Sequence, residues 1–141
     1  VLINLMKNAA ESIEHAHLPT ARRSVELRVV PKTIEDQQVV EFSVLDLGGG
    51  LSPEVMGRLY EAFYSTKAEG MGIGLKLCRS IVESHQGRLE AENLYNALEV
   101  TGCRFTFWIP VSPLLAPQLE STTFATELPV DDLAIKNSSA P

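Results

Sequence analysis

The chain has 141 residues, of which 45% are hydrophobic, and a formal net charge of −6 at pH 7. This length suits one domain with its own core, and no apolar run approaches the roughly 20 residues of a membrane-spanning helix. The acidic balance argues against nucleic acid as the main partner, because phosphate backbones favour clustered Lys and Arg. A nucleotide, which a few local donors can hold, stays possible.

The segment 1–16 predicts an amphipathic helix. Its apolar residues recur at helical spacing and form one stripe, which consists of Leu2, Leu5, Met6, Ala9 and Ile13. Asn4, Asn8 and Glu11 follow each other at intervals of four and three residues, so they share a neighbouring stripe. Two amides one turn apart can cap, can hydrogen-bond a nearby loop, or can meet a hydrated Mg²⁺ through a carbonyl oxygen.

A β-hairpin and a glycine run follow this helix. The segments 25–31 and 39–47 are rich in β-formers, and the polar stretch between them suits a turn. Asp46 stands near the end of the second strand, just before the glycines at 48–50. A carboxylate beside glycines that let a ligand touch the backbone suits recognition of the exocyclic amino group of adenine. A strand that simply ends in an Asp-Gly turn is the alternative.

Two further helices are expected. Ser52, Pro53 and Glu54 form a helix start, and a longer helix is expected over 72–86. The inner face of this longer helix is predicted to be Ile73, Leu77, Ile81 and Val82. Glycines 70, 72 and 74 open it and leave backbone N–H groups free for an anion, with a flexible hinge as the alternative. The segment is neither a Rossmann fingerprint nor a P-loop.

The last part of the chain predicts two strands and a tail. The strands are expected at 88–93 and 103–110, the second with alternating apolar residues. Residues 111–141 are rich in Pro, Ser, Thr and Ala without a period, which is typical of a flexible tail or linker. The element order predicts an α+β sandwich over residues 1–110, with helices covering one face of a mixed sheet.

Four segments in this order resemble the motifs of one family. NLMKNAAESI (4–13) resembles the N box, DLGGGL (46–51) the first glycine box, YEAFYSTK (60–67) the F box and GMGIGLKLCRSIVESHQG (70–87) the second glycine box. The chain is thereby similar to the ATP-binding catalytic domain of sensor histidine kinases, within the Bergerat-fold (GHKL) group of gyrase, Hsp90, MutL and kinase ATPases. The resemblance implies a Bergerat sandwich truncated at its N-terminus, since the helix and strand that normally precede the N box are missing.

The resemblance also implies a role for each site residue at the base and metal. Asn8 is the Mg²⁺ ligand, and Asn4 lies one turn before it in a catalytic position. Asp46 reads adenine, with Gly48 and Gly50 letting the base approach.

The resemblance also implies which residues contact the phosphates of the nucleotide. Gly70, Gly72, Gly74 and Leu75 bring the backbone of the second glycine box to the phosphates. Lys67 is similar to a catalytic lysine that reaches the terminal phosphates in kinases with a short lid, and Lys7 is a further candidate. The short lid before Gly70 resembles that of the nitrogen- and oxygen-sensing branch, which is an analogy.

Two positions depart from the family pattern. The usual Asn and Pro of the first glycine box are Leu47 and Gly49 here, which costs a polar contact and loosens the loop but keeps the adenine carboxylate. None of His15, His17 and His85 stands in the phosphoacceptor context of the family. The phosphorylated histidine is therefore expected on a separate helical dimerisation domain, which then serves the receiver domain of a response regulator.

The implied function is transfer of the γ-phosphoryl group of Mg–ATP to that histidine. The resemblance implies a cytoplasmic location for this domain, in a parent protein that can be anchored in a membrane. The segment itself is expected neither to insert in a membrane nor to bind nucleic acid. Cys78 and Cys103, far apart and without a metal-ligand spacing, are expected to be small buried hydrophobes. Two alternatives stay open: an ATP-hydrolysing clamp, which would need a carboxylate at position 4, and a nonenzymatic docking module with a degenerate pocket.

Overall fold

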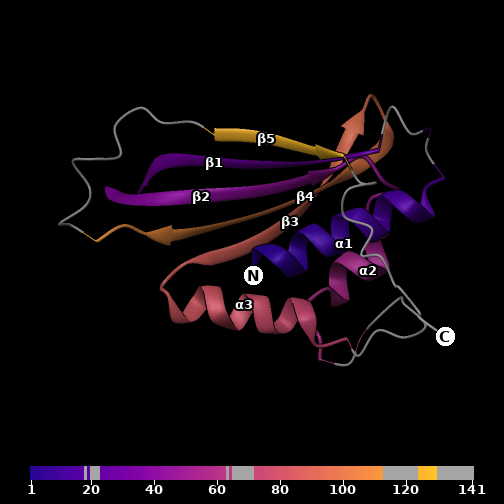
Figure 1. Cartoon of the computed structure of the whole chain (residues 1–141). Helices are drawn as coiled ribbons and strands as arrows, with labels where there is room; N and C mark the ends of the chain where they lie inside the picture. Colours follow the sequence, from indigo (N-terminus) through magenta and orange to yellow (C-terminus); the bar gives the residue numbers. More distant parts are fainter. Residues whose placement is uncertain (18, 20–22, 63, 65–71, 113–123, 130–141) are drawn as a thin grey trace, which may run out of the picture.

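The computed structural model describes residues 1–17, 19, 23–62, 64, 72–112 and 124–129. Its elements in chain order are α1 (Leu2–His15), β1 (Ser24–Ile34), β2 (Gln37–Asp46), α2 (Pro53–Arg58), α3 (Gly74–Ser84), β3 (Arg88–Asn96), β4 (Glu99–Pro110) and β5 (Phe124–Pro129). Figure 1 shows the helices gathered on one face of the sheet. The predicted α+β sandwich is confirmed. No helix within the described residues has the length and apolar character needed to cross a membrane.

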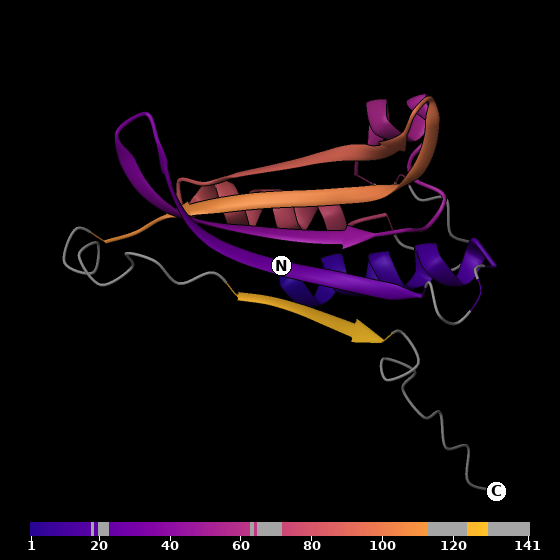
Figure 2. The same cartoon turned by 90° about the horizontal axis from the view of Figure 1, so that it is seen from above.

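The strands form a five-stranded sheet in the order β3-β4-β2-β1-β5. Two hairpins, β1–β2 and β3–β4, meet where β2 pairs with β4 (Figure 2). The sequence predicts a mixed sheet, but every pairing among the described strands is antiparallel. The reason is that β4 returns along β2 in the opposite direction, with Cys103 opposite Asp46 and Pro110 opposite Val39.

The strand β5 departs from the expectation of a tail without regular structure. It pairs with the outer edge of β1, from Ser24 opposite Pro129 to Val29 opposite Phe124. An open sheet edge presents backbone N–H and C=O groups that need partners, and β5 supplies them. A division of the chain after residue 110 stays a prediction, but these six residues belong to the sheet.

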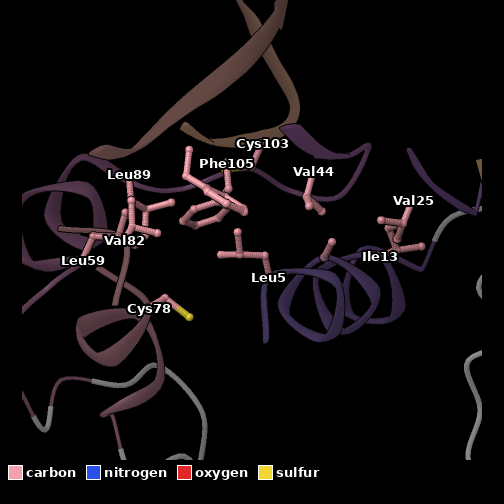
Figure 3. Close-up of a cluster of buried hydrophobic side chains, with 12 residues drawn as sticks. Leu5, Ile13, Val25, Val44, Leu59, Cys78, Val82, Leu89, Cys103 and Phe105 are labelled. Atoms are coloured by element: carbon pink, nitrogen blue, oxygen red, sulfur yellow. The ribbon is translucent and has the colours of Figure 1, made fainter. Parts of the chain in front are cut away.

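The core lies between the sheet and α1 and α3. Leu5, Ala9 and Ile13 on α1 are buried. Leu5 and Ile13 point toward side chains of the sheet such as Phe105 and Val25 (Figure 3). The predicted α1 stripe is thus correct, with Leu2 and Met6 packed at its border. Truncating such a buried Leu or Ile to Ala costs about 2–5 kcal/mol, so this packing fixes the position of α1.

The inner face of α3 differs from the predicted one. Only Val82 of the predicted set is buried, and it shares the buried row with Cys78, one turn earlier. Leu77 is 54% exposed, and Ile73 and Ile81 are 39% and 38% exposed. Two apolar rows of helical period lie next to each other on this helix, and the sequence does not show which one meets the sheet. The row Ile73, Leu77, Ile81 is left facing outward, and we call it the α3 outer row.

Candidate nucleotide-binding site

A row of polar side chains on α1 connects the two ends of the candidate site. Asn4, Asn8 and Ser12 follow each other at four-residue spacing, and all three are half-buried. They lie directly beside the buried row of Leu5, Ala9 and Ile13, because each is one residue away from a member of it. At 1.5 Å per residue the row is about 12 Å long. It therefore runs along the border of the core.

Asp46 lies at the Ser12 end of this row. Its side chain is buried, with 3% of the residue exposed. The Ser12 hydroxyl donates to Asp46 Oδ1 at 3.0 Å, and the Gly48 backbone N–H donates to the same oxygen at 2.9 Å. Burial raises the pKa of Asp46, while the hydrogen bonds from Gly48 and Ser12 act in the opposite direction. The result is a carboxyl group held firmly by two donors in a poorly solvated place.

The glycine loop after β2 is packed closely against its neighbours. A Cβ at Gly48 would overlap the Ser12 hydroxyl, and Gly50 has a left-handed φ of +68°. Asn93 on β3 fixes the end of the loop: the Leu51 N–H donates to Asn93 Oδ1 and Asn93 Nδ2 donates to the Leu51 carbonyl, both at 2.8 Å. The backbone near Asp46 is thus tightly shaped, because the glycines let α1, β3 and β4 pack directly against the loop.

The other end of the row meets the start of α3. A Cβ at Gly74 would come within 2.5 Å of Asn4 Nδ2, so glycine lets the two helices touch there. The N-cap of α3 is Ile73, which makes no side-chain capping bond. Gly72 before it has a φ of +65°. The first-turn N–H groups of an α-helix have no partner within the helix and favour an anion. Leu75 packs its side chain on the core, so only its backbone can face a ligand.

The two predicted lysines and Gly70 have no established place at the site. Lys67 and Gly70 lie outside the described residues. Lys7 is exposed on α1, with its Nζ 3.9 Å from Glu11 Oε1. The structure therefore brings Asn4 to Gly74 and Asp46 to Gly48, with Asn8 between the two ends. It assigns Lys7 no contact with either end.

Two polar residues of the site were not predicted from the sequence. Ser12 is 34 residues from Asp46 in the chain, and Asn93 is 42 residues from Leu51. Ser12 could have been identified, because it lies four residues after Asn8, just as Asn8 lies four residues after Asn4. Asn93 has no local signal, because its partner Leu51 is 42 residues away in the chain.

A cavity of about 930 Å³ lies elsewhere, lined by residues of α2 and α3 and by residues of β1, β2, β3 and β4. None of the predicted nucleotide-binding residues lines it. Its arginines are engaged with carboxylates, since Arg79 bonds Glu83 at 2.8 Å and Arg104 bonds Glu92 at 2.9 Å. The α1 site, with a buried carboxyl group at one end and a helix N-terminus at the other, suits a nucleotide better.

The histidines and cysteines have structural positions. His15 Nδ1 lies 2.6 Å from the Glu11 carbonyl, and His85 Nδ1 lies 2.8 Å from the Ile81 carbonyl, so both serve helix ends. Cys78 and Cys103 are free and buried, as predicted. Burial raises the pKa of the Cys103 thiol to about 12, with Asp46 adding to the effect, so this thiol stays neutral and unreactive.

Asn8 fits a Mg²⁺–nucleotide by its chemistry. An amide oxygen is a hard ligand, and Mg²⁺ in proteins takes one or two protein oxygens plus substrate phosphates and waters. Asn8 is half-buried on the same row as Asn4, between the carboxyl end and the α3 end. The role of Asn8 as the metal ligand stays a prediction.

Comparisons with known proteins show a family and a fold for this chain. The model of the family "Histidine kinase-, DNA gyrase B-, and HSP90-like ATPase" matches residues 1–113. The sensor protein FixL of Bradyrhizobium diazoefficiens is 36% identical over 112 residues, which cover 79% of this chain and 20% of FixL. The chain spans a fifth or less of the length of FixL and of other curated relatives that it matches.

Two solved structures share the fold. The catalytic domain of histidine kinase ThkA is 31% identical, with a TM-score of 0.55, over 77% of this chain and 62% of that one. Full-length ShkA in complex with AMPPNP is 25% identical, with a TM-score of 0.54, over 77% of this chain and 20% of that one.

Proposed function

Because the chain belongs to the family of histidine kinase-, DNA gyrase B- and HSP90-like ATPases, we propose that it binds Mg–ATP along α1 and transfers the γ-phosphoryl to a histidine on a separate helical domain. The relatives in this family include named sensor kinases and histidine kinase catalytic domains. The named sensor kinases are much longer than this chain, so transfer between domains of one larger kinase is the natural setting. A response regulator would receive the phosphoryl group in turn.

The observation that carries the proposal is the α1 row. Ser12 contacts the buried carboxyl of Asp46 at one end, and Asn4 touches Gly74 at the start of α3 at the other. An ionised Asp46 accepts the proton of a 6-amino group and disfavours a 6-oxo group. The α3 N-terminus offers backbone donors to phosphate. The complex of ShkA with AMPPNP supports the same class of ligand.

Positioning and charge neutralisation would supply most of the rate. Mg²⁺, when bound, neutralises phosphate charge, and Asn8 is the residue proposed to hold it. Gly48 and Gly50 admit the base, the amides of Gly72, Gly74 and Leu75 face the phosphates, and Gly70 is proposed for the same role from its place in the second glycine box. Lys67 is proposed to reach the terminal phosphates, with Lys7 as a further cation. Asn4 offers an amide in place of a base, which favours a kinase over a hydrolytic clamp.

The helical partner would dock on the α3 outer row. Ile73, Leu77 and Ile81 are exposed at i, i+4 and i+8, and they begin next to the proposed phosphate site. A regular apolar row of this kind is what an amphipathic helix packs against. A histidine carried by such a helix would then reach the γ-phosphate. We also propose a cytoplasmic location, where ATP is available and free thiols stay reduced.

A transfer assay tests the proposal. The chain is mixed with the helical domain of its kinase and with ATP labelled at the γ-phosphate. We expect the histidine of the helical domain to become labelled, Asn8→Ala to abolish labelling, and Gln37→Ala, at the end of β2 opposite Asp46, to leave it unchanged. Labelling by Asn8→Ala at the wild-type rate would contradict the metal role. ATP binding without any transfer would favour the docking module.

A further inference from the structure

Ser12 is a polar residue of α1 whose contacts the motifs do not explain. Its hydroxyl reaches across the fold to Asp46 Oδ1 at 3.0 Å. The Gly48 N–H donates to the same oxygen from the loop side at 2.9 Å. The two donors therefore meet on one oxygen, Oδ1, and neither of these bonds uses Oδ2.

The contact joins three parts of the fold. A Cβ at Gly48 would overlap Ser12 Oγ, so α1, the end of β2 and the glycine loop meet at this hydroxyl. Asp46 is almost fully buried there. Two hydrogen bonds that reach the same carboxylate oxygen from different sides fix the side-chain torsion angles of Asp46. The direction of the second oxygen, Oδ2, is then fixed as well.

We infer that Ser12 is a positioning residue for purine recognition: it holds Asp46 so that Oδ2 faces the exocyclic amino group of adenine. This inference rests on the proposed function, because it assumes that Asp46 contacts the base. Ser12 would thereby help to set the preference for a 6-amino purine over a 6-oxo purine.

The ionisation of Asp46 also depends on Ser12. Burial raises the pKa of Asp46, and the Ser12 bond counteracts part of this effect. The register partners of Asp46 are Val25 on β1, which is apolar, and Cys103 on β4. The Cys103 thiol has a pKa of about 12 and stays neutral. Without the Ser12 hydroxyl, Asp46 holds its proton to a higher pH. A protonated Asp46 donates a hydrogen bond, and it then suits a 6-oxo purine.

The test compares Ser12→Ala with Ser43→Ala. Ser43 lies three residues before Asp46 on β2, is also buried, and places its Oγ 3.2 Å from Thr106 Oγ1, away from Asp46. Calorimetry gives the affinities for Mg–ATP and Mg–ITP at neutral and mildly acidic pH. We expect Ser12→Ala to weaken ATP binding about fivefold at neutral pH, the value of one hydrogen bond. The loss should grow on acidification, and the ATP preference over ITP should fall. Ser43→Ala should match the wild type.

A second measurement needs no nucleotide. The Gly48 amide proton is bonded to Asp46 Oδ1, so its NMR shift follows the ionisation of that carboxyl. Its titration midpoint should move to higher pH in Ser12→Ala and stay in place in Ser43→Ala. Ser12→Cys, a near-isosteric weak donor, should fall between the two.

The outcomes separate the two proposals. If Ser12→Ala keeps the wild-type ATP affinity, ITP discrimination and Gly48 midpoint, Ser12 does not position Asp46, while the proposed function stands as long as Asp46→Ala loses ATP. If the wild-type chain binds no ATP, the proposed function is wrong and the role of Ser12 with it.

Discussion

The burial of the Asp46 carboxyl group lowers the free energy of unfolding at neutral pH. Burial raises its pKa above the ordinary value of 3.8, so the folded state binds more protons than the unfolded state between that value and its folded pKa. Stability therefore falls as the pH rises through this window and stays lower at neutral pH. A ligand that pairs with the carboxylate would offset this cost, which is why such groups cluster at functional sites.

The substitution Asp46→Asn is expected to have opposite effects on stability and on ATP binding. The amide keeps the shape and an oxygen acceptor for Gly48 and Ser12 but carries no charge. We expect a higher melting temperature than wild type at pH 7, and a smaller difference as the pH is lowered. ATP binding should weaken at least about tenfold, because a charged acceptor is lost.

Thermal unfolding and calorimetry measure both effects, with Asp36→Asn in the exposed β1–β2 turn as a control. Asp36 has a left-handed φ of +64° that Asn also tolerates. A lower melting temperature for Asp46→Asn than for wild type at pH 7 would contradict the assigned cost of burial.

Single residues could be predicted where their signal is local. Asp46 and the glycines after it stand together in the sequence, and so do Asn4 and Asn8. Ser12 and Asn93 act on partners 34 and 42 residues away, and only the packing of α1 and β3 onto the loop brings them there.

At the scale of elements, α3 shows where periodicity is ambiguous. Cys78 and Val82 form one helical row, and Leu77 and Ile81 form the next. Both rows are apolar, so spacing predicts the helix but not its rotation about its axis. The rotation follows from packing against β3 and α1, and it leaves the α3 outer row exposed.

The strand β5 leads to a prediction about the sheet edge. Deleting 113–141 should uncover the backbone of Ser24–Val29, which β5 covers with six residue pairs. At a few tenths of a kcal/mol for each pair, the loss is about 1–3 kcal/mol. We also expect self-association, because an open edge pairs with other chains.

Hydrogen exchange and sedimentation measure these effects. The matched control deletes 130–141 only and keeps β5. Faster exchange of the edge amides of residues 24–29 should appear in the longer deletion alone. Equal exchange and equal sedimentation in both deletions would mean that β5 does not hold this edge.

The overall architecture could be predicted best from the sequence. The order of helices, hairpins and glycine runs predicts an α+β sandwich, and the helices do lie on one face of the sheet. The strand directions and the sheet edge were less predictable, since they depend on pairings between distant segments such as β2 with β4 and β1 with β5.

The proposed kinase function requires that bound ATP stay intact until a histidine arrives. Asn4, beside the start of α3, carries an amide with no useful basicity. A carboxylate at this position would serve as a general base, an effect of about 10²–10⁴ in rate. Asn4→Asp is close in shape and supplies that base.

The most direct measurement is the release of inorganic phosphate from Mg–ATP by the purified chain under saturating nucleotide. We predict ATP binding with negligible turnover and no self-labelling for the wild type, and at least about tenfold faster hydrolysis for Asn4→Asp. Brisk hydrolysis by the wild-type chain, unchanged in Asn4→Asp and abolished by Asp46→Ala, would contradict the kinase account and favour an ATP-hydrolysing clamp.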